Sequence, residues 1–167
     1  MIPNRLPSKL DPQNVVALID TREQLPLSLT PLRTERATLT TGDYSARGFE
    51  DEVCIERKSL DDLLACVGRE RDRFERELHR MHAFPIRVLL IEATWDDIDR
   101  GGWRSQLTVS QVAGSLVGWS AMGLQISLVG KHERAGVYTS RLLYTIARRR
   151  YQQLRSLFNP DEAPNDL

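Results

Sequence analysis

Cysteine is scarce in this chain, and neither sign of charge is in excess. The 167 residues include two cysteines, Cys54 and Cys66, which are too few for a disulfide framework or a four-cysteine zinc site. Lysine and arginine number 23, as do aspartate and glutamate, so any nucleic-acid partner must be bound by a local basic patch. The shortage of cysteine favours a reducing, cytoplasmic location.

Long apolar runs are also missing. The sequence has no stretch approaching the roughly 18 apolar residues of a membrane span, so we expect no contact with a membrane. The first residues, 1–14, lack the apolar segment of a secretory signal. Apolar residues still make up 41% of the chain, which is enough for the core of one domain.

Short apolar runs alternate with helical patterns along the chain, which favours an α/β fold with a central mixed sheet flanked by helices. We expect one domain over residues 14–156, a flexible arm over 1–13 and a flexible tail over 157–167. The expected strands are 15–20, a hairpin over 39–58, 86–92 and 124–129. The expected helices are 59–66, 69–84, 108–122 and 132–156, with a loop over 92–106.

The expected hairpin carries charges on a predictable face. Centring its turn between Phe49 and Glu50 places Asp43 directly opposite Glu56. Opposite residues of an antiparallel pair point to the same face, with Cβ atoms roughly 4.5–5.5 Å apart, so the two carboxylates repel unless a cation lies between them. Strand alternation adds Lys58 to this face and turns Arg57 to the other.

Two interpretations of this hairpin remain open from the residues alone. Two carboxylates suit a hard divalent cation such as magnesium, and Lys58 would then orient a water or stabilise charge on a phosphate. The alternative is a surface ion pair worth at most about 1 kcal/mol. Asp20, at the end of the first strand, is a third acid that reaches the site if that strand lies beside the hairpin.

Asp62 also has two interpretations. Ser59 and Asp62 have the spacing of a helix capping box, which explains the acid without any role in catalysis. The functional interpretation makes Asp62 the partner of Arg57, or a group that orients metal ligands from outside.

Several ordered blocks together resemble the nuclease domain of XPF-type structure-specific endonucleases. The signature of that family is Gly-Asp, a variable gap, Glu-Arg-Lys, three residues and Asp. The matching residues are Gly42-Asp43, Glu56-Arg57-Lys58 and Asp62, preceded by Asp20-Thr21-Arg22-Glu23 and followed by Gly68-Arg69 and a strand that ends in Glu92.

The resemblance implies a restriction-endonuclease-like fold, also called PD-(D/E)XK, and hydrolysis of DNA phosphodiesters that depends on Mg²⁺ or Mn²⁺. It implies Asp43 and Glu56 as metal ligands, with Asp20 as a further one, and Lys58 beside the nucleophile. Arg57 and Asp62 complete the implied catalytic set. The family also implies DNA as the partner and a possible homodimer.

Two departures from the family pattern limit what the resemblance implies. No tandem helix-hairpin-helix module follows the last expected helix, so we expect a stand-alone nuclease domain of bacterial or phage type. The family often has glutamine where this chain has Arg73. The preferred DNA structure, whether fork, flap or junction, therefore stays open.

The helix expected over 69–84 has a basic face. At about 100° per residue, its arginines gather opposite an apolar stripe, so that one face packs on the core and the other meets DNA phosphates. The expected DNA-binding residues are Arg22, Arg69, Arg73, Arg76 and Arg80. The alternative is a solvated face with the i,i+4 pairs Arg71–Glu75, Asp72–Arg76 and Arg73–Glu77.

Two functions remain in competition at this point. The first is a metal-dependent DNA endonuclease that acts on branched or otherwise structured DNA. The second is a non-catalytic DNA-binding or scaffolding domain of the same fold. Every acid of the motif and its lysine are present in the sequence, which favours the first.

Overall fold

A six-stranded mixed sheet forms the centre of the molecule, in a computed structural model that describes residues 7–158. Its strands lie in the order β2-β1-β3-β4-β5-β6. Strand β1 pairs in parallel with β2, and β5 in parallel with both β4 and β6, whereas β3 runs antiparallel to β1 and β4. The bounds are Val16–Asp20 for β1, Arg33–Ala37 for β2, Tyr44–Ala46 for β3, Val53–Ser59 for β4, Ile86–Glu92 for β5 and Gln125–Leu128 for β6.

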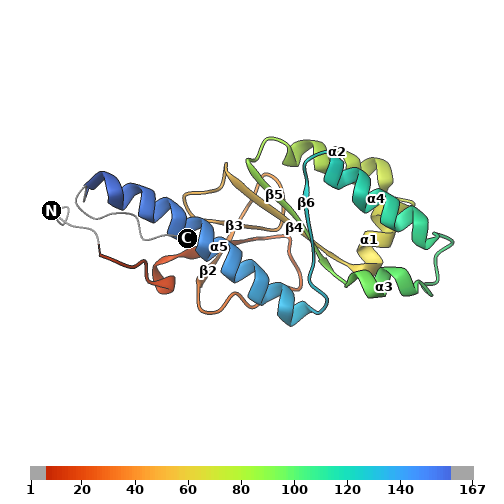
Figure 1. The fold of residues 1–167 in the computed structure, drawn as a ribbon, viewed down its shortest axis with the longest axis horizontal. Coiled ribbons are helices and arrows are strands. Elements are labelled where there is room, and N and C mark those ends of the chain that lie inside the picture. Colours follow the sequence, from red (N-terminus) through yellow and green to blue (C-terminus); the bar gives the residue numbers. More distant parts are fainter. Residues whose placement is uncertain (1–6, 159–167) are drawn as a thin grey trace.

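The helices are unevenly distributed over the sheet. Figure 1 shows the long helix α5 crossing the sheet, while α1, α2, α3 and α4 gather at the other end of the molecule. The bounds are Leu60–Val67 for α1, Arg71–Met81 for α2, Trp95–Arg100 for α3, Val109–Ala121 for α4 and His132–Phe158 for α5, with a 3-10 turn at Pro12–Asn14. The predicted α/β class with a mixed central sheet is confirmed.

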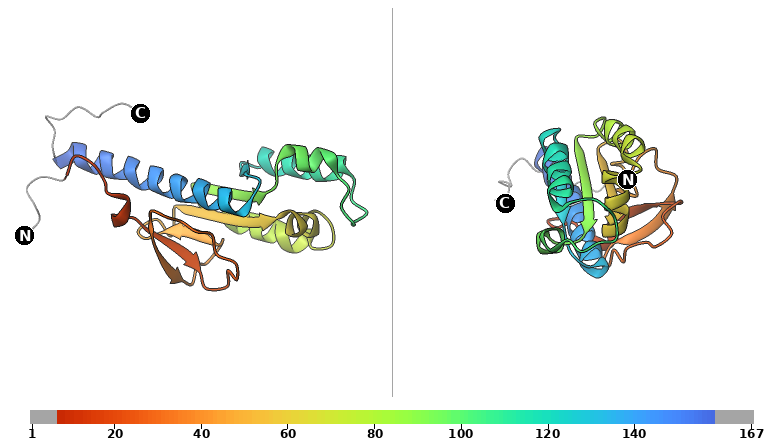
Figure 2. Two further views of the ribbon diagram at one scale, coloured as in Figure 1. Left: turned by 90° about the horizontal axis from the view of Figure 1, so that it is seen from below. Right: turned by 90° about the vertical axis from the view of Figure 1, so that its right-hand side faces the viewer.

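Alternation along the central strands divides the core into two layers. Cys54 and Leu89 pack with α1, α2 and α4, whereas Ile55 and Val88 pack with α5. Figure 2 shows α5 lying along one side of the strands. Charged residues on β4 therefore meet one of two environments according to whether their number is even or odd.

The hairpin has the predicted register. Tyr44 pairs with Ile55, which places Asp43 opposite Glu56 as expected. Gly48 adopts a positive φ of 84° at the turn, a conformation that glycine tolerates without strain. The geometry on which the candidate site depends was thus predictable from the sequence.

Two elements were predicted wrongly. The segment 92–106 was expected to be a loop, but it contains helix α3, which begins with a capping box between Thr94 and Asp97. Strand β2 was not expected at all, because its side chains are mostly exposed and charged and follow no apolar pattern. It joins the sheet through backbone pairing with β1.

The ends of the chain were expected to form a flexible arm and a flexible tail. Of these, residues 1–6 and 159–167 lie outside the described part. Residues 7–10 contact α5 where Tyr151 donates a hydrogen bond to the Pro7 carbonyl and Tyr144 to that of Leu10. Between residues 7 and 158, no helix has the length and apolar character required to cross a membrane.

Candidate active site

Three neighbouring strands bring acidic side chains to the same face of the sheet. Asp20 ends β1, Asp43 directly precedes β3, and Glu56 lies within β4. Asp20 shares its face with Val16 and Leu18, and the Asp20 backbone N–H donates to the Asp43 carbonyl at 2.8 Å. Strand β1 therefore lies beside the hairpin, which was the condition for Asp20 to reach the site.

Gly42 allows Asp43 to reach this position. It has a φ of 80°, which favours glycine, and a Cβ built on it would lie 2.6 Å from Cys54 Sγ and 3.0 Å from the Ile55 carbonyl oxygen. The Asp43 backbone N–H donates to that same carbonyl at 2.8 Å. Only a residue without a side chain lets the chain turn so closely against β4.

Asp43 and Glu56 form a pair of like charges in a poorly solvated place. Burial, and then the negative charge of Asp43, raises the pKa of Glu56 to about 8. Burial also raises the pKa of Asp43 to about 6, against the effect of the Arg57 backbone N–H, which donates to its Oδ2 at 2.8 Å. Both carboxylates are therefore held at a cost that a bound cation would relieve.

One oxygen of Glu56 lacks a partner. Glu56 is 3% exposed, and its Oε1 accepts a hydrogen bond from Lys58 while its Oε2 accepts none within the described residues. A buried carboxylate oxygen without a donor is costly unless a cation or a water completes it. The donor set of Asp43 and Glu56 thus fits a hard divalent cation.

Lys58 lies on the predicted face, paired with Glu56. Its Nζ is 5.4 Å from the centre of the Phe74 ring on α2, so the ammonium sits between the sheet and that helix. Burial favours the neutral amine, but the charge and the hydrogen bond of Glu56, together with nearby Cys66 and Asp43, outweigh burial and raise the pKa of Lys58. The amine is therefore a fixed cation at neutral pH.

Both carboxylate oxygens of Asp20 accept hydrogen bonds from neighbouring residues. Its Oδ1 accepts from Arg22 Nε at 2.6 Å, and its Oδ2 accepts from the Leu39 backbone at 2.8 Å. Burial would raise the pKa of Asp20, but the hydrogen bonds from Arg22 and Leu39 lower it to about 2. A metal-binding role for Asp20 stays a prediction, as does DNA binding by Arg22, whose side chain is 69% exposed.

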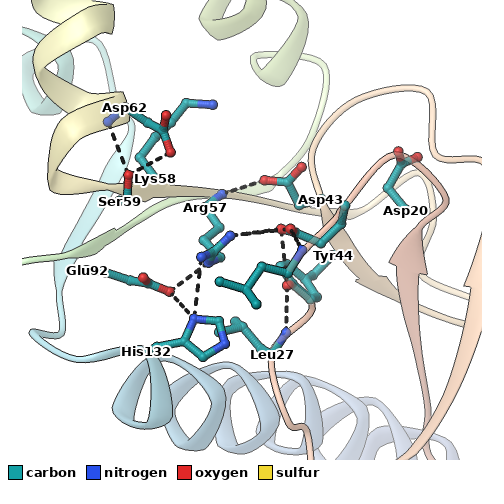
Figure 3. A network of polar contacts seen from close by, with 12 residues as sticks. Asp20, Leu27, Asp43, Tyr44, Arg57, Lys58, Ser59, Asp62, Glu92 and His132 are labelled. Atoms are coloured by element: carbon teal, nitrogen blue, oxygen red, sulfur yellow. Dashed lines mark hydrogen bonds and ion pairs between the residues drawn. The ribbon is translucent and has the colours of Figure 1, made fainter.

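Arg57 points to the opposite face, as alternation predicts. Its Nε donates to Glu92 at 2.7 Å (Figure 3). Its Nη1 donates to Glu23 at 3.2 Å. His132 Nδ1 lies 2.8 Å from the same Glu92 oxygen. These contacts join the loop after β1, the end of β5 and the start of α5 behind the strand that carries Glu56.

The interpretation of Asp62 as the partner of Arg57 is wrong. Asp62 is exposed, its backbone N–H donates to Ser59 Oγ at 3.1 Å, and its carboxylate accepts from that hydroxyl at 2.7 Å. Figure 3 shows Asp62 and Ser59 apart from the Arg57 network. Ser59 therefore caps α1 with Asp62 as its partner, and the catalytic role of Asp62 stays a prediction.

The arginine face of α2 is exposed, as expected. Arg73 on the helix is 73% exposed, and Arg69, which lies in the turn before α2 and not on the helix as expected, is 82% exposed. Arg73 Nη2 lies 3.0 Å from Glu70. Arg76 makes no ion pair or hydrogen bond with a side chain within residues 7–158. Of the three expected i,i+4 pairs, the described residues show only Arg71–Glu75, at 2.9 Å.

The roles of three residues around Arg57 were not predicted from the sequence. Glu23 and Glu92 stood in the family blocks without an assigned role, and His132 lies 40 positions beyond Glu92. A buried arginine needs carboxylate partners. Because strand alternation turns Arg57 away from Glu56 and Lys58, acidic partners such as Glu23 and Glu92 could have been expected on that other face. No pattern in the sequence pointed to His132.

The repulsion at the site predicts how stability depends on pH. A carboxyl whose folded pKa is raised stabilises the fold below its ordinary pKa and loses this contribution as the pH rises through the folded value. For Asp43 and Glu56 that window runs from ordinary values of 3.8 and 4.5 to about 6 and about 8. In EDTA the protein should therefore lose stability on the order of a few kcal/mol between about pH 4 and pH 8.

Asp43→Asn should flatten this loss, because the amide removes one charge while its oxygen still accepts from Arg57. Melting temperatures of both proteins in EDTA at about pH 5 and pH 8 provide the check. The melting temperature of the variant should exceed that of the natural protein at the higher pH and differ little from it at the lower pH. Parallel curves would show that the two carboxylates do not repel in the folded state.

Comparisons with known proteins identify the family to which this chain belongs. The family model of the ERCC4 domain matches residues 19–142. Since the match covers most of the chain, the protein belongs to the ERCC4 domain family. A search of curated proteins gave no match.

Solved structures show the same fold. XPF from Aeropyrum pernix superimposes with a TM-score of 0.66 at 15% identity, over 86% of this chain and 74% of that one. XPF from Aeropyrum pernix in complex with DNA gives a TM-score of 0.62 at 16% identity, over 83% and 66%. The chain therefore has the same fold as XPF, and the predicted resemblance to XPF-type proteins and the predicted α/β class are confirmed.

Proposed function

We propose that this protein is a divalent-metal-dependent endonuclease that hydrolyses phosphodiester bonds in branched or otherwise structured DNA. One observation carries the proposal. Glu56 is buried, has one oxygen with no hydrogen-bond donor among residues 7–158, and lies opposite Asp43 and beside Lys58 on one face of the sheet. A surface ion pair would not hold two repelling carboxylates in this position.

Asp43 and Glu56 are the residues that would hold Mg²⁺ or Mn²⁺. No three aspartate, glutamate, histidine or cysteine side chains between residues 7 and 158 are already placed to bind one ion. Two carboxylates suffice for Mg²⁺, because this ion usually keeps several waters and binds substrate phosphates as well. When bound, the cation would polarise the phosphate and lower the pKa of a water.

Lys58 supplies the fixed positive charge of the proposed reaction. In hydrolysis, a water oxygen forms a bond to phosphorus, the bond to one ester oxygen breaks, and negative charge grows on the phosphate oxygens. An ammonium pinned between Glu56 and the Phe74 ring stabilises that charge without having to move. Glu56 orients the amine.

Arg57 would act through position and not through contact with DNA. Its guanidinium is 11% exposed and saturated by Glu23 and Glu92 on the far side of the sheet. The Arg57 backbone N–H donates a hydrogen bond to Asp43 Oδ2. Because the side-chain contacts fix the position of Arg57, this hydrogen bond orients the proposed metal ligand.

DNA would cross the arginine face of α2. Phosphate contacts attract DNA of any sequence and release counterions, which makes binding depend on salt. Arg76→Ala should therefore weaken binding to several DNA sequences alike and flatten the slope of log affinity against log salt by about one unit. Binding is measured in calcium across a salt series.

Arg71→Ala is the matched control for this prediction. Arg71 lies on the same helix but donates hydrogen bonds to Glu75 and Ser115. Its loss should therefore lower the melting temperature and change the DNA affinity little. If Arg76→Ala instead binds DNA with unchanged affinity and salt slope, α2 is not the binding surface.

A homodimer also belongs to the proposal. Strand β6 is an edge of the sheet, and between it and α5 lies a hollow of about 590 Å³. The hollow includes Val137, which is 49% exposed. Light scattering of the purified protein would show whether it pairs.

A cleavage panel tests the proposed function. Labelled linear, forked, flapped and four-way DNA would be incubated with the protein in Mg²⁺, Mn²⁺ or EDTA. The proposal expects cleavage in either metal, none in EDTA, and a preference among the four substrates. DNA binding without cleavage in both metals would favour the non-catalytic alternative.

A further inference from the structure

Helix α2 passes over the candidate site in a fixed direction. Strands β4 and β5 are parallel, with Val53 opposite Ile86, so the chain must return between them and α2 must run antiparallel to β4. Phe74 lies at the level of Lys58, as the 5.4 Å contact shows. Three residues further along the helix, about 4.5 Å, Glu77 comes level with Glu56, which lies about two strand residues before Lys58.

The flank of α2 that carries Glu77 faces away from α4. Arg71 and Glu75 lie on the other flank, where Arg71 bonds Ser115 of α4. At about 100° per residue, Glu77 and Glu75 project on opposite sides of Phe74, which points into the core. Glu77 therefore borders the side of the helix next to β3 and Asp43.

The charges at the site agree with this placement. After burial and the Asp43 charge, and against Lys58, Glu77 contributes to the raised pKa of Glu56. It acts in the same direction on Asp43 and also lies near Arg22. Its ion-pair partner on the helix, Arg80, is 3.9 Å away, and Glu77 itself is only 24% exposed.

A third acid above two repelling carboxylates is unfavourable unless a cation is bound there. Glu56 is 3% exposed, and its Oε2 has no donor in the described part of the chain, which is the independent sign of a missing positive partner. Glu77 is not placed to join Asp43 and Glu56 around one ion directly. A hydrated cation resolves this, because its water can bridge to a carboxylate further away.

We propose that Glu77 is a third carboxylate of the divalent-cation site, holding a water of the cation bound by Asp43 and Glu56. This proposal rests on the proposed function, since it needs the cation that hydrolysis would use. Glu77 would fix the orientation of that water from the side of α2, opposite the sheet that carries Lys58. It is thus a positioning residue for the proposed reaction.

Manganese binding tests the role of Glu77 without measuring activity. The free Mn²⁺ signal in electron paramagnetic resonance is titrated with the natural protein, Glu77→Gln and Glu75→Gln. The two variants remove the same charge from the same helix, but Glu75 faces α4. Glu77→Gln should weaken Mn²⁺ binding about tenfold, and Glu75→Gln should leave it nearly unchanged.

Thermal stability supplies a second readout. In EDTA, Glu77→Gln should be at least as stable as the natural protein, because a repulsion is gone, yet it should gain less from added Mn²⁺. A purely structural pair with Arg80 predicts lower stability in EDTA and an unchanged response to Mn²⁺.

The outcomes separate this inference from the function on which it rests. Equal Mn²⁺ affinity of Glu77→Gln and the natural protein, or equal weakening by both variants, overturns the role of Glu77 and leaves the proposed function standing. Failure of the natural protein to bind Mn²⁺ at all overturns both.

Discussion

Glu56→Gln should lower the single-turnover rate of DNA cleavage at least about a thousandfold, while the protein folds and binds DNA as before. The amide keeps the shape of the side chain but loses the charge that would hold the cation. Because Glu56 is buried and opposite Asp43, its charge is worth most where the cation would lie. Asp43→Asn should have an effect of similar size.

Glu52→Gln is the matched control for that experiment. Glu52 precedes the same strand, but its carboxylate pairs with Arg150 at 2.6 Å, away from Asp43 and Glu56. It should cleave DNA at the natural rate. Cleavage in Mg²⁺ by both Glu56→Gln and Asp43→Asn would refute the two-carboxylate site.

Lys58→Ala should lower cleavage about 100- to 1000-fold with little change in cation affinity. An ammonium cannot ligate a metal, so its contribution falls on the charge that develops during the reaction. Removing it leaves Glu56 free of its partner, which should preserve or slightly strengthen metal binding. Calorimetric metal titration beside single-turnover rates measures the two effects separately.

Lys131→Ala is the control for Lys58, since Lys131 is exposed just before α5. A rate for Lys58→Ala equal to that of this control would remove Lys58 from the mechanism. A loss confined to cation affinity would assign it a structural role instead.

Local rules were enough to predict the central hairpin. The turn at Gly48 and strict strand alternation set the register, so the positions of Asp43, Glu56 and Lys58 followed by counting. The apolar stripe of α2 likewise predicted its buried Phe74 and Leu78.

The elements that were missed depend on contacts that no local pattern records. Strand β2 is exposed and charged, and it is held by pairing with β1, whose five residues are all buried. Helix α3 has six residues, too few to show a helical period of apolar residues. Its capping pair, Thr94 and Asp97, nevertheless has the spacing of a helix start in the sequence.

The network around Arg57 lies beyond local rules in the same way. Glu23, Glu92 and His132 are 34, 35 and 75 positions from Arg57. Only the sheet order, which places β4 between β3 and β5, brings these residues together. Of the interpretations of Asp62, the pairing with Arg57 is wrong, whereas the predicted contact with Ser59 at the start of α1 is observed.

Anomalous diffraction from a crystal grown with Mn²⁺ and a DNA product would test the cation site most directly. We predict a manganese peak within ligand distance of Asp43 and the Oε2 of Glu56, with Lys58 beside it and outside the coordination shell. A peak elsewhere, or an Oε2 satisfied by a protein donor with no metal nearby, would rule out a cation site at these two carboxylates.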